Sequence, residues 1–130
     1  MTRRITTKFE KIQEIADEIS KAKNVEAVYL FGSYASEKNT PLSDIDLCII
    51  GNLNEKEKNK AFEFLSDNLD ISLFNDLPII IKSRVLKEGK LLAVKNIKFL
   101  HKLKIKTFRE YLDFKHIINR YCQEVLKCTI

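Results

Sequence analysis

The amino-acid sequence predicts a small α/β domain, in which helices pack on a mixed β-sheet. Two observations predict this class: short apolar runs have the length of buried strands, and apolar residues at helical spacing lie between them. The 130 residues suit one domain with a single hydrophobic core. We expect one domain over residues 1–130, with its core over about 1–94 and a helical extension over about 96–127.

The first half of the core is expected to form a helix followed by two strands. Residues 7–10 have the pattern of a capping box, and apolar residues at helical spacing then predict a helix over about 7–23. The apolar run at 25–31 predicts a buried strand. A second strand is expected over 44–50, ended by Gly51.

The second half of the core repeats this alternation. Asn54 has the side chain of an N-cap and predicts a helix that continues to about Asn68. A third strand is expected over 69–74, and a short helix should begin near Pro78 and end at Gly89.

The C-terminal part of the chain is expected to be an edge strand and one long amphipathic helix. Residues 91–94 predict the strand, and the apolar stripe within 96–127 predicts the helix. At about 1.5 Å per residue this helix is about 45 Å long, which exceeds the width of so small a domain. It must therefore bend or pack its far end on another chain.

Three carboxylates are predicted to converge on one face of the sheet. Alternate residues of a strand face the same side, so Asp44 and Asp46 point together on the second strand. Asp70 lies on the polar face of the third strand, and joins them if the two strands are neighbours. Carboxylates this close repel one another unless a cation neutralises them, and oxygen ligands of this kind suit Mg²⁺.

A phosphate-binding turn is predicted beside these carboxylates. Gly32 permits a tight turn at the end of a strand, and the Ser33 hydroxyl and nearby backbone N–H groups can grip a phosphate. Together with metal-binding carboxylates, such a turn supplies the parts for in-line nucleotidyl transfer from a triphosphate such as ATP. Alone, a Gly-Ser pair is usually an ordinary turn, and an Asp-x-Asp pair is usually surface acid or a cap.

The combined pattern resembles the minimal nucleotidyltransferases of the DNA-polymerase-β-like superfamily. Residues 30–35, LFGSYA, and 40–47, TPLSDIDL, match their Gly-Ser, ten-residue spacer, Asp-x-Asp signature. The similarity continues through 89–92, GKLL, and 109–115, REYLDFK, which resemble the antitoxin subgroup (MntA) of HEPN/MNT toxin–antitoxin systems. The resemblance implies a polymerase-β-like fold that ends in a long helix.

The resemblance also implies roles for individual residues. Gly32 and Ser33 would bind the nucleotide phosphates, and Asp44 and Asp46 would hold Mg²⁺. Asp70 matches the family's third carboxylate, as a base or as a further metal ligand. All three aspartates are thus candidate catalytic and metal-binding residues.

The implied activity is transfer of AMP from ATP to a tyrosine hydroxyl of a cognate HEPN ribonuclease toxin, which AMP then silences. Two alternatives stay open: an antitoxin that acts by binding alone, and a transferase acting on a small-molecule hydroxyl. Family members often have Arg-Gly where this chain has Ser36 and Glu37, which favours the binding-only alternative mildly. Retention of all three carboxylates argues against it.

Charge is distributed unevenly along the chain. The segment 82–109 holds ten lysine and arginine residues and one acid, Glu88, so its net charge is +9. The remaining residues carry a net charge of −4, and the whole chain carries +5. Such a block favours an acidic partner or a polyanion, although a solvated lysine-rich face explains it equally well. It lacks the interleaved aromatics of a single-strand binder, which argues against direct nucleic-acid binding. Arg109 and His116 match the spacing of the HEPN ribonuclease motif only nominally.

Composition indicates a cytoplasmic protein. No apolar run approaches the roughly 18–20 residues of a membrane span, and the N-terminus lacks the pattern of a secretory signal. The three cysteines, Cys48, Cys122 and Cys128, are odd in number and lack metal-ligand spacing, so reduced thiols are expected. Cys48 shares a face with the Asp-x-Asp pair and is expected to be a small buried hydrophobe.

Overall fold

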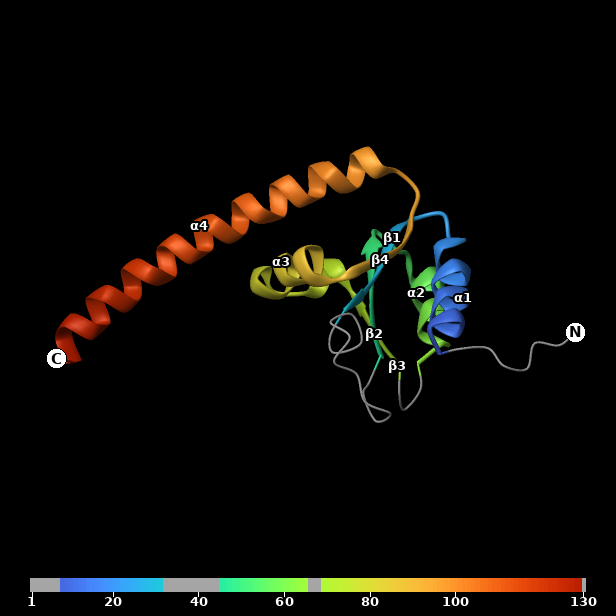
Figure 1. Ribbon diagram of the computed structural model, residues 1–130, viewed down its shortest axis with the longest axis horizontal. Helices are drawn as coiled ribbons and strands as arrows, with labels where there is room; N and C mark the ends of the chain where they lie inside the picture. Colours follow the sequence, from blue (N-terminus) through green and yellow to red (C-terminus); the bar gives the residue numbers. More distant parts are fainter. Residues whose placement is uncertain (1–7, 32–44, 66–68, 130) are drawn as a thin grey trace, which may run out of the picture.

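A computed structural model describes residues 8–31, 45–65 and 69–129 of the chain. It is an α/β fold in which four strands form a single sheet with helices on both faces (Figure 1). In chain order the elements are α1 (Lys8–Ser20), β1 (Val25–Phe31), β2 (Ile45–Gly51), α2 (Glu55–Phe62), β3 (Leu69–Leu73), the 3₁₀ turn η1 (Phe74–Asp76), α3 (Ile79–Glu88), β4 (Lys90–Val94) and α4 (Ile97–Thr129).

The sheet is mixed, as predicted. Its strand order is β3-β2-β1-β4, so β1 and β2 form the centre. The β1 strand runs antiparallel to both β2 and β4, whereas β2 and β3 are parallel. The predicted fourth strand is confirmed as the edge strand β4, and Gln13 of α1 holds it by donating from Nε2 to the Leu92 carbonyl at 2.8 Å.

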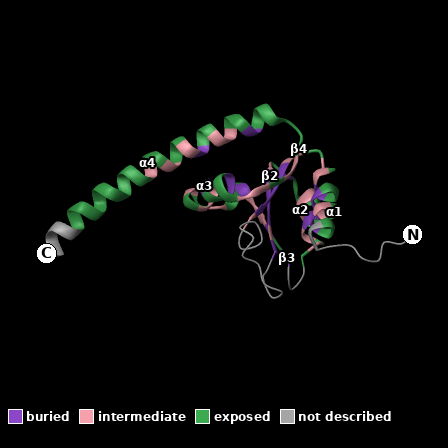
Figure 2. Ribbon diagram, viewed as in Figure 1, coloured by how far each residue is buried: buried purple, intermediate pink, exposed green. Residues whose placement is uncertain are grey.

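The two faces of the sheet bury two separate apolar clusters. Alternate side chains of the central strands, such as Leu30 and Leu47, pack under α1 and α2. The intervening side chains, such as Tyr29 and Cys48, pack under α3 and the beginning of α4. Figure 2 shows this buried material concentrated in the strands and the inner faces of the helices. A central strand covered on both sides explains why its sequence is a nearly continuous apolar run.

The second helix begins as predicted but is shorter than expected. Asn54 and Glu57 form a complete capping box, with Glu57 N donating to Asn54 Oδ1 at 2.8 Å. Glu57 also accepts hydrogen bonds from Asn24, which ties α2 to the start of β1. The helix ends at Phe62 rather than near Asn68, because its only buried residue is Ala61 and no apolar stripe extends it.

Two glycines occupy positions that a larger residue could not take. Gly51 ends β2 with φ of 152°, and a Cβ built there would lie 2.1 Å from the Asn24 carbonyl oxygen. Gly89 ends α3, as predicted, with an extended rather than a left-handed backbone. A Cβ on Gly89 would lie 2.5 Å from the Val85 carbonyl oxygen, so this glycine allows α3 to turn closely into β4.

The C-terminal helix projects beyond the rest of the fold. It has 33 residues and is about 50 Å long. Asn96 caps its start, because Asn96 Oδ1 accepts from Lys98 N and Phe99 N at 3.0 and 3.2 Å. Leu100 and Thr107 are buried against the body, whereas the described side chains at 115–125 are exposed (Figure 2).

The described helices were compared with the requirements for a membrane span. Within the described ranges, no helix combines the length and the apolar character that crossing a bilayer requires.

The close approach at Gly51 makes a testable prediction. Gly51→Ala should lower the free energy of unfolding by about 2–4 kcal/mol. The added Cβ would clash with the Asn24 carbonyl oxygen, and alanine rarely adopts the positive φ of this position. Urea denaturation followed by circular dichroism would measure the change. Asn59→Ala, on the exposed surface of α2, is the control and should alter stability by less than about 0.5 kcal/mol. Equal midpoints for the two variants would contradict this account of Gly51.

Candidate active site

Two of the predicted carboxylates lie side by side in the sheet. Asp46 and Asp70 are the second residues of β2 and β3, and they are register partners across this parallel pair. Neighbouring strands lie about 4.8 Å apart, and register partners point to the same face. The expectation that the strands are neighbours is therefore confirmed. Asp46 is half-buried, whereas Asp70 is exposed.

The apolar pattern of the strands fixes the face on which these aspartates lie. Ile45 and Leu47 flank Asp46 in the sequence, and both are buried in the cluster under α1 and α2. Leu69 and Ile71 flank Asp70 in the same way. Because side chains alternate along a strand, both aspartates must take the opposite face, on the side of α3 and α4.

The carboxylate pair lies at the end of β1. Phe31, the last residue of that strand, is the register partner of Asp46. Gly32 and Ser33 follow Phe31 in the sequence and Asp44 precedes Ile45, and all three lie outside the described residues. Their predicted roles, and the start of the second strand at Asp44, remain predictions.

Along β2, the surface beside the carboxylates becomes buried within one step, whereas the same step along β3 reaches the half-buried Ser72. Cys48 and Ser72 are the next register pair on the same face, and Cys48 is fully buried. Burial raises the pKa of the Cys48 thiol to about 12, and burial likewise raises the pKa of Tyr29, its register partner on β1. The prediction that Cys48 is a small buried hydrophobe is confirmed. The carboxylates thus stand at the border between a dry core and solvent.

The described donors fit part of a site for a hard cation. Asp46 and Asp70 offer oxygen ligands on adjacent strands, and Asp70 Oδ1 accepts a hydrogen bond from Ile71 N at 3.0 Å, which orients that carboxylate. Among the residues that the structure describes, no group of three or more His, Cys, Asp or Glu side chains could hold a metal. A complete site would need Asp44, which precedes β2.

Lys90, a member of the basic block at 82–109, lies at the same end of the sheet. Lys90 opens β4 as the register partner of Leu30, next to Phe31. The pattern of β4 alone could not place it there, because the pairing of β4 with β1 is a tertiary contact. Arg109 and His116 are exposed on α4.

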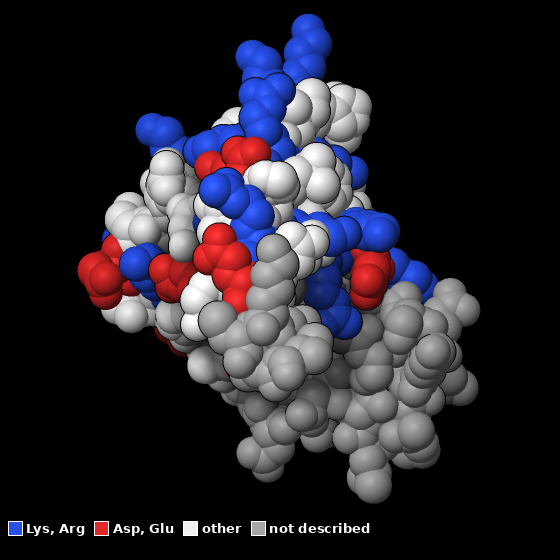
Figure 3. Space-filling model, turned by 90° about the vertical axis from the view of Figure 1, so that its left-hand side faces the viewer, with Lys and Arg blue, Asp and Glu red and all other residues white. Residues whose placement is uncertain are grey.

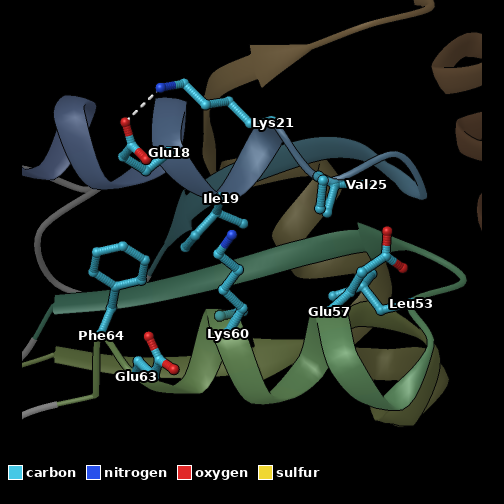
Figure 4. Close-up of a pocket in the computed structure, with 11 residues that line it drawn as sticks. Glu18, Ile19, Lys21, Val25, Leu53, Glu57, Lys60, Glu63 and Phe64 are labelled. Atoms are coloured by element: carbon cyan, nitrogen blue, oxygen red, sulfur yellow. Dashed lines mark hydrogen bonds and ion pairs between the residues drawn. The ribbon is translucent and has the colours of Figure 1, made fainter.

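A cleft between α1 and α2 lies on the other face of the sheet from the carboxylates. Figure 4 shows Lys60 and Phe64 around it, with Lys21 at its rim bonded to Glu18 at 2.6 Å. Its volume is about 190 Å³. Because it opens under α1 and α2, it is not part of the carboxylate site.

Comparison with solved structures identifies the fold. One chain of a toxin–antitoxin complex with AMP-PNP matches with a TM-score of 0.70 and 19% identity, over 92% of this chain and 99% of that chain. A chain from the Shewanella oneidensis complex of tri-AMPylated HEPN toxin with MNT antitoxin matches with a TM-score of 0.62 and 19% identity, over 89% and 93% of the two chains. At these identities the likeness concerns the fold.

One relative of this chain is recognised by sequence similarity. A protein of Methanocaldococcus jannaschii, whose name suggests protein adenylyltransferase activity, is 35% identical over 68 residues. The aligned region is 50% of this chain and 52% of that protein, so the chain spans about half the length of this relative.

The mixed sheet, its paired carboxylates and the long final helix define an α/β domain of the nucleotidyltransferase class. The model of the family described as "Polymerase beta, Nucleotidyltransferase" matches residues 10–98. The chain belongs to this family.

The environment of Cys48 predicts selective thiol chemistry. With a pKa near 12, its thiol stays protonated at pH 8 and is shielded, whereas Cys122 is exposed. In the native protein, iodoacetamide should modify Cys122 at least about tenfold faster than Cys48, because the thiolate is the reactive form. Peptide mass spectrometry would measure both rates, and labelling in denaturant is the control in which the difference should vanish. Comparable native rates would show that the strand face beside Asp46 is open to solvent.

Proposed function

We propose that this protein transfers AMP from ATP to a hydroxyl group. The observation that carries the proposal is the register pairing of Asp46 and Asp70 on adjacent parallel strands, at the end of β1. In this proposal Asp44, Asp46 and Asp70 hold Mg²⁺, and Gly32 and Ser33 bind the nucleotide phosphates. Family membership and the sequence signature support these roles.

The reaction balances as an in-line substitution. The acceptor oxygen forms a bond to the α-phosphorus of ATP, the bond from that phosphorus to the bridging oxygen breaks, and pyrophosphate leaves. Bound Mg²⁺ would stabilise negative charge on the phosphates. Asp70 is exposed, and its carboxylate accepts a hydrogen bond from Ile71 N. In this proposal it takes the hydroxyl proton or, as the alternative, acts as a further metal ligand.

The acceptor is proposed to be a protein, because α4 exposes large apolar side chains beyond the part that packs on the body. The far part of α4 offers a docking surface, the apolar stripe formed by Tyr111, Phe114, Ile118 and Tyr121. Ile118 and Tyr121 are 40% and 64% exposed. Aromatic side chains of this kind are enriched at interface cores.

The proposed partner is a HEPN ribonuclease toxin, with a tyrosine hydroxyl as the acceptor. The toxin–antitoxin complexes that share this fold, one of them with AMPylated toxin, support this choice. An AMP group near a ribonuclease Arg-x(4–6)-His motif would add negative charge, repel RNA phosphates and silence the toxin.

Neutralisation by binding alone is the second candidate. The exposed apolar surface of α4 favours it, since occlusion needs only such a docking surface. Ser36 and Glu37, in place of the usual Arg-Gly, favour it as well. The two candidates differ in whether the bound toxin gains mass.

The metal-binding proposal predicts the effect of one isosteric substitution. Asp46→Asn should weaken Mg²⁺–ATP binding by on the order of 100-fold, because it removes a charged ligand. Isothermal titration calorimetry would measure both affinities, and Asp76→Asn, at an exposed acid in η1, is the matched control. Thermal unfolding should show that both variants fold. Unchanged affinity in Asp46→Asn would remove Asp46 from the proposed site.

The transferase proposal predicts a covalent product. Purified cognate HEPN toxin mixed with this protein, ATP and Mg²⁺ should gain the mass of one or more AMP groups, and Asp44→Ala should abolish the gain. Intact-mass spectrometry would detect the product, and tandem spectrometry would locate the modified tyrosine. A toxin that is fully inhibited but unmodified would replace the enzymatic proposal with occlusion.

A further inference from the structure

A groove between α3 and α4 is unused by the proposed chemistry. Its volume is about 500 Å³, within the range of about 300–1,000 Å³ that is usual for ligand pockets. It is lined by Ser83, Arg84, Lys87 and Glu88 of α3 and by Phe108, Tyr111 and Leu112 of α4. The sequence did not indicate it, because its two walls are at least twenty residues apart and meet only in the tertiary structure.

The α4 wall of the groove is apolar. Phe108 packs against the buried cluster under α3, and Tyr111 is half-buried. Leu112 is 61% exposed, so much of this wall remains open for contact. A wall of this kind can receive an apolar side chain from a partner.

The rim of the groove is basic. Arg84 and Lys87 line the α3 side, and the Arg84 guanidinium lies 3.9 Å from the Glu88 carboxylate, a weak exposed pair. On α4, Lys104 lies four residues before Phe108 and Lys115 four residues after Tyr111, so both share the face of the apolar wall. Figure 3 shows lysine and arginine side chains gathered over much of this end of the molecule.

One border of the groove lies near the end of the sheet that holds the carboxylates. Glu88 at its border precedes Gly89, and a Cβ on Gly89 would lie 3.1 Å from the Leu30 carbonyl oxygen. Leu30 precedes Phe31, the register partner of Asp46. The helices α3 and α4 also cover the sheet face on which Asp46 lies.

We propose that this groove binds an acidic segment of the acceptor protein, with an apolar side chain seated on its α4 wall. This inference rests on the proposed transfer to a protein hydroxyl and specifies what is recognised: carboxylates that flank an apolar anchor. A nucleic acid fits the groove less well, because Phe108 packs against the buried cluster and Tyr111 is half-buried, so neither ring offers a fully exposed face for stacking.

The experiment compares two charge variants of this protein. Lys87→Glu combined with Arg84→Gln alters the groove, and Lys56→Glu on α2 is the control on the other side of the fold. The cognate HEPN toxin is the probe for binding by biolayer interferometry and for AMP transfer. Thermal unfolding checks that each variant folds, and Leu112→Ser tests the apolar wall without a change of charge.

If the groove binds the acceptor, the groove variant should show a rise of about tenfold or more in both the KM and the Kd for toxin, with the KM for ATP unchanged. The loss should shrink at high salt, because the Debye length falls below about 8 Å. The control variant should match the wild type. Replacing an acidic residue of the toxin by lysine should restore part of the binding to the Lys87→Glu protein.

Other results would overturn the inference. An unchanged Kd and KM for toxin in the groove variant would remove the groove from acceptor binding. Loss of single-stranded RNA binding with toxin binding intact would assign it to nucleic acid instead. If the wild type binds toxin tightly but transfers no AMP, the transferase proposal fails, and the Kd of the variant alone decides the groove. A wild type that does not bind toxin would overturn both.

Discussion

The parallel pairing of β2 with β3 is the constraint on which the candidate site depends. It places Asp46 beside Asp70, while Leu47 and Ile71 of the same register fill the core under α1 and α2. A slip of one residue would turn Asp70 into that core, where an unpaired carboxylate costs several kcal/mol. Burial of the apolar set therefore fixes the register, and the register positions the chemistry. No further interaction is needed to bring the two carboxylates together.

The same burial explains why polar chemistry is confined to one end of the sheet. Along β2 the residues from Leu47 to Ile50 are buried on both faces, so a polar side chain there would lose its water. Where β2 and β3 begin, solvent reaches the face that holds the aspartates, and Asp70 is exposed at that point. The raised pKa of Cys48, caused by burial, marks the boundary. A cation bound between the aspartates would thus have a dry surface on one side, which strengthens its interaction with them.

The sequence predicted the strands, their facing and the α2 cap because each depends on local periodicity or on a single capping side chain. The sequence did not predict features that depend on tertiary contacts. The Asn54 cap predicted where the second helix begins but not where it ends: Ala61 is its one buried residue, and the helix ends at Phe62 instead of near Asn68. Likewise, Lys90 could be placed near the end of β1 only once β4 was paired with β1. The phosphate-binding turn and Asp44 stay predictions, since they lie outside the described residues.

The long final helix connects the site with its proposed partner. Its beginning is stabilised by burial of Leu100 and Thr107, and its far part exposes apolar side chains such as Ile117 and Tyr121. Isolated helical segments are marginal in water, so exposed apolar surface on such a segment is best stabilised by a second surface. The groove beside α3 is lined by Phe108, Tyr111 and Leu112, which precede that far part on α4. In the proposed complex, a partner that docks on the exposed part of α4 would also contact the basic rim of the groove, so docking and acceptor recognition would use adjoining surfaces of the same helix.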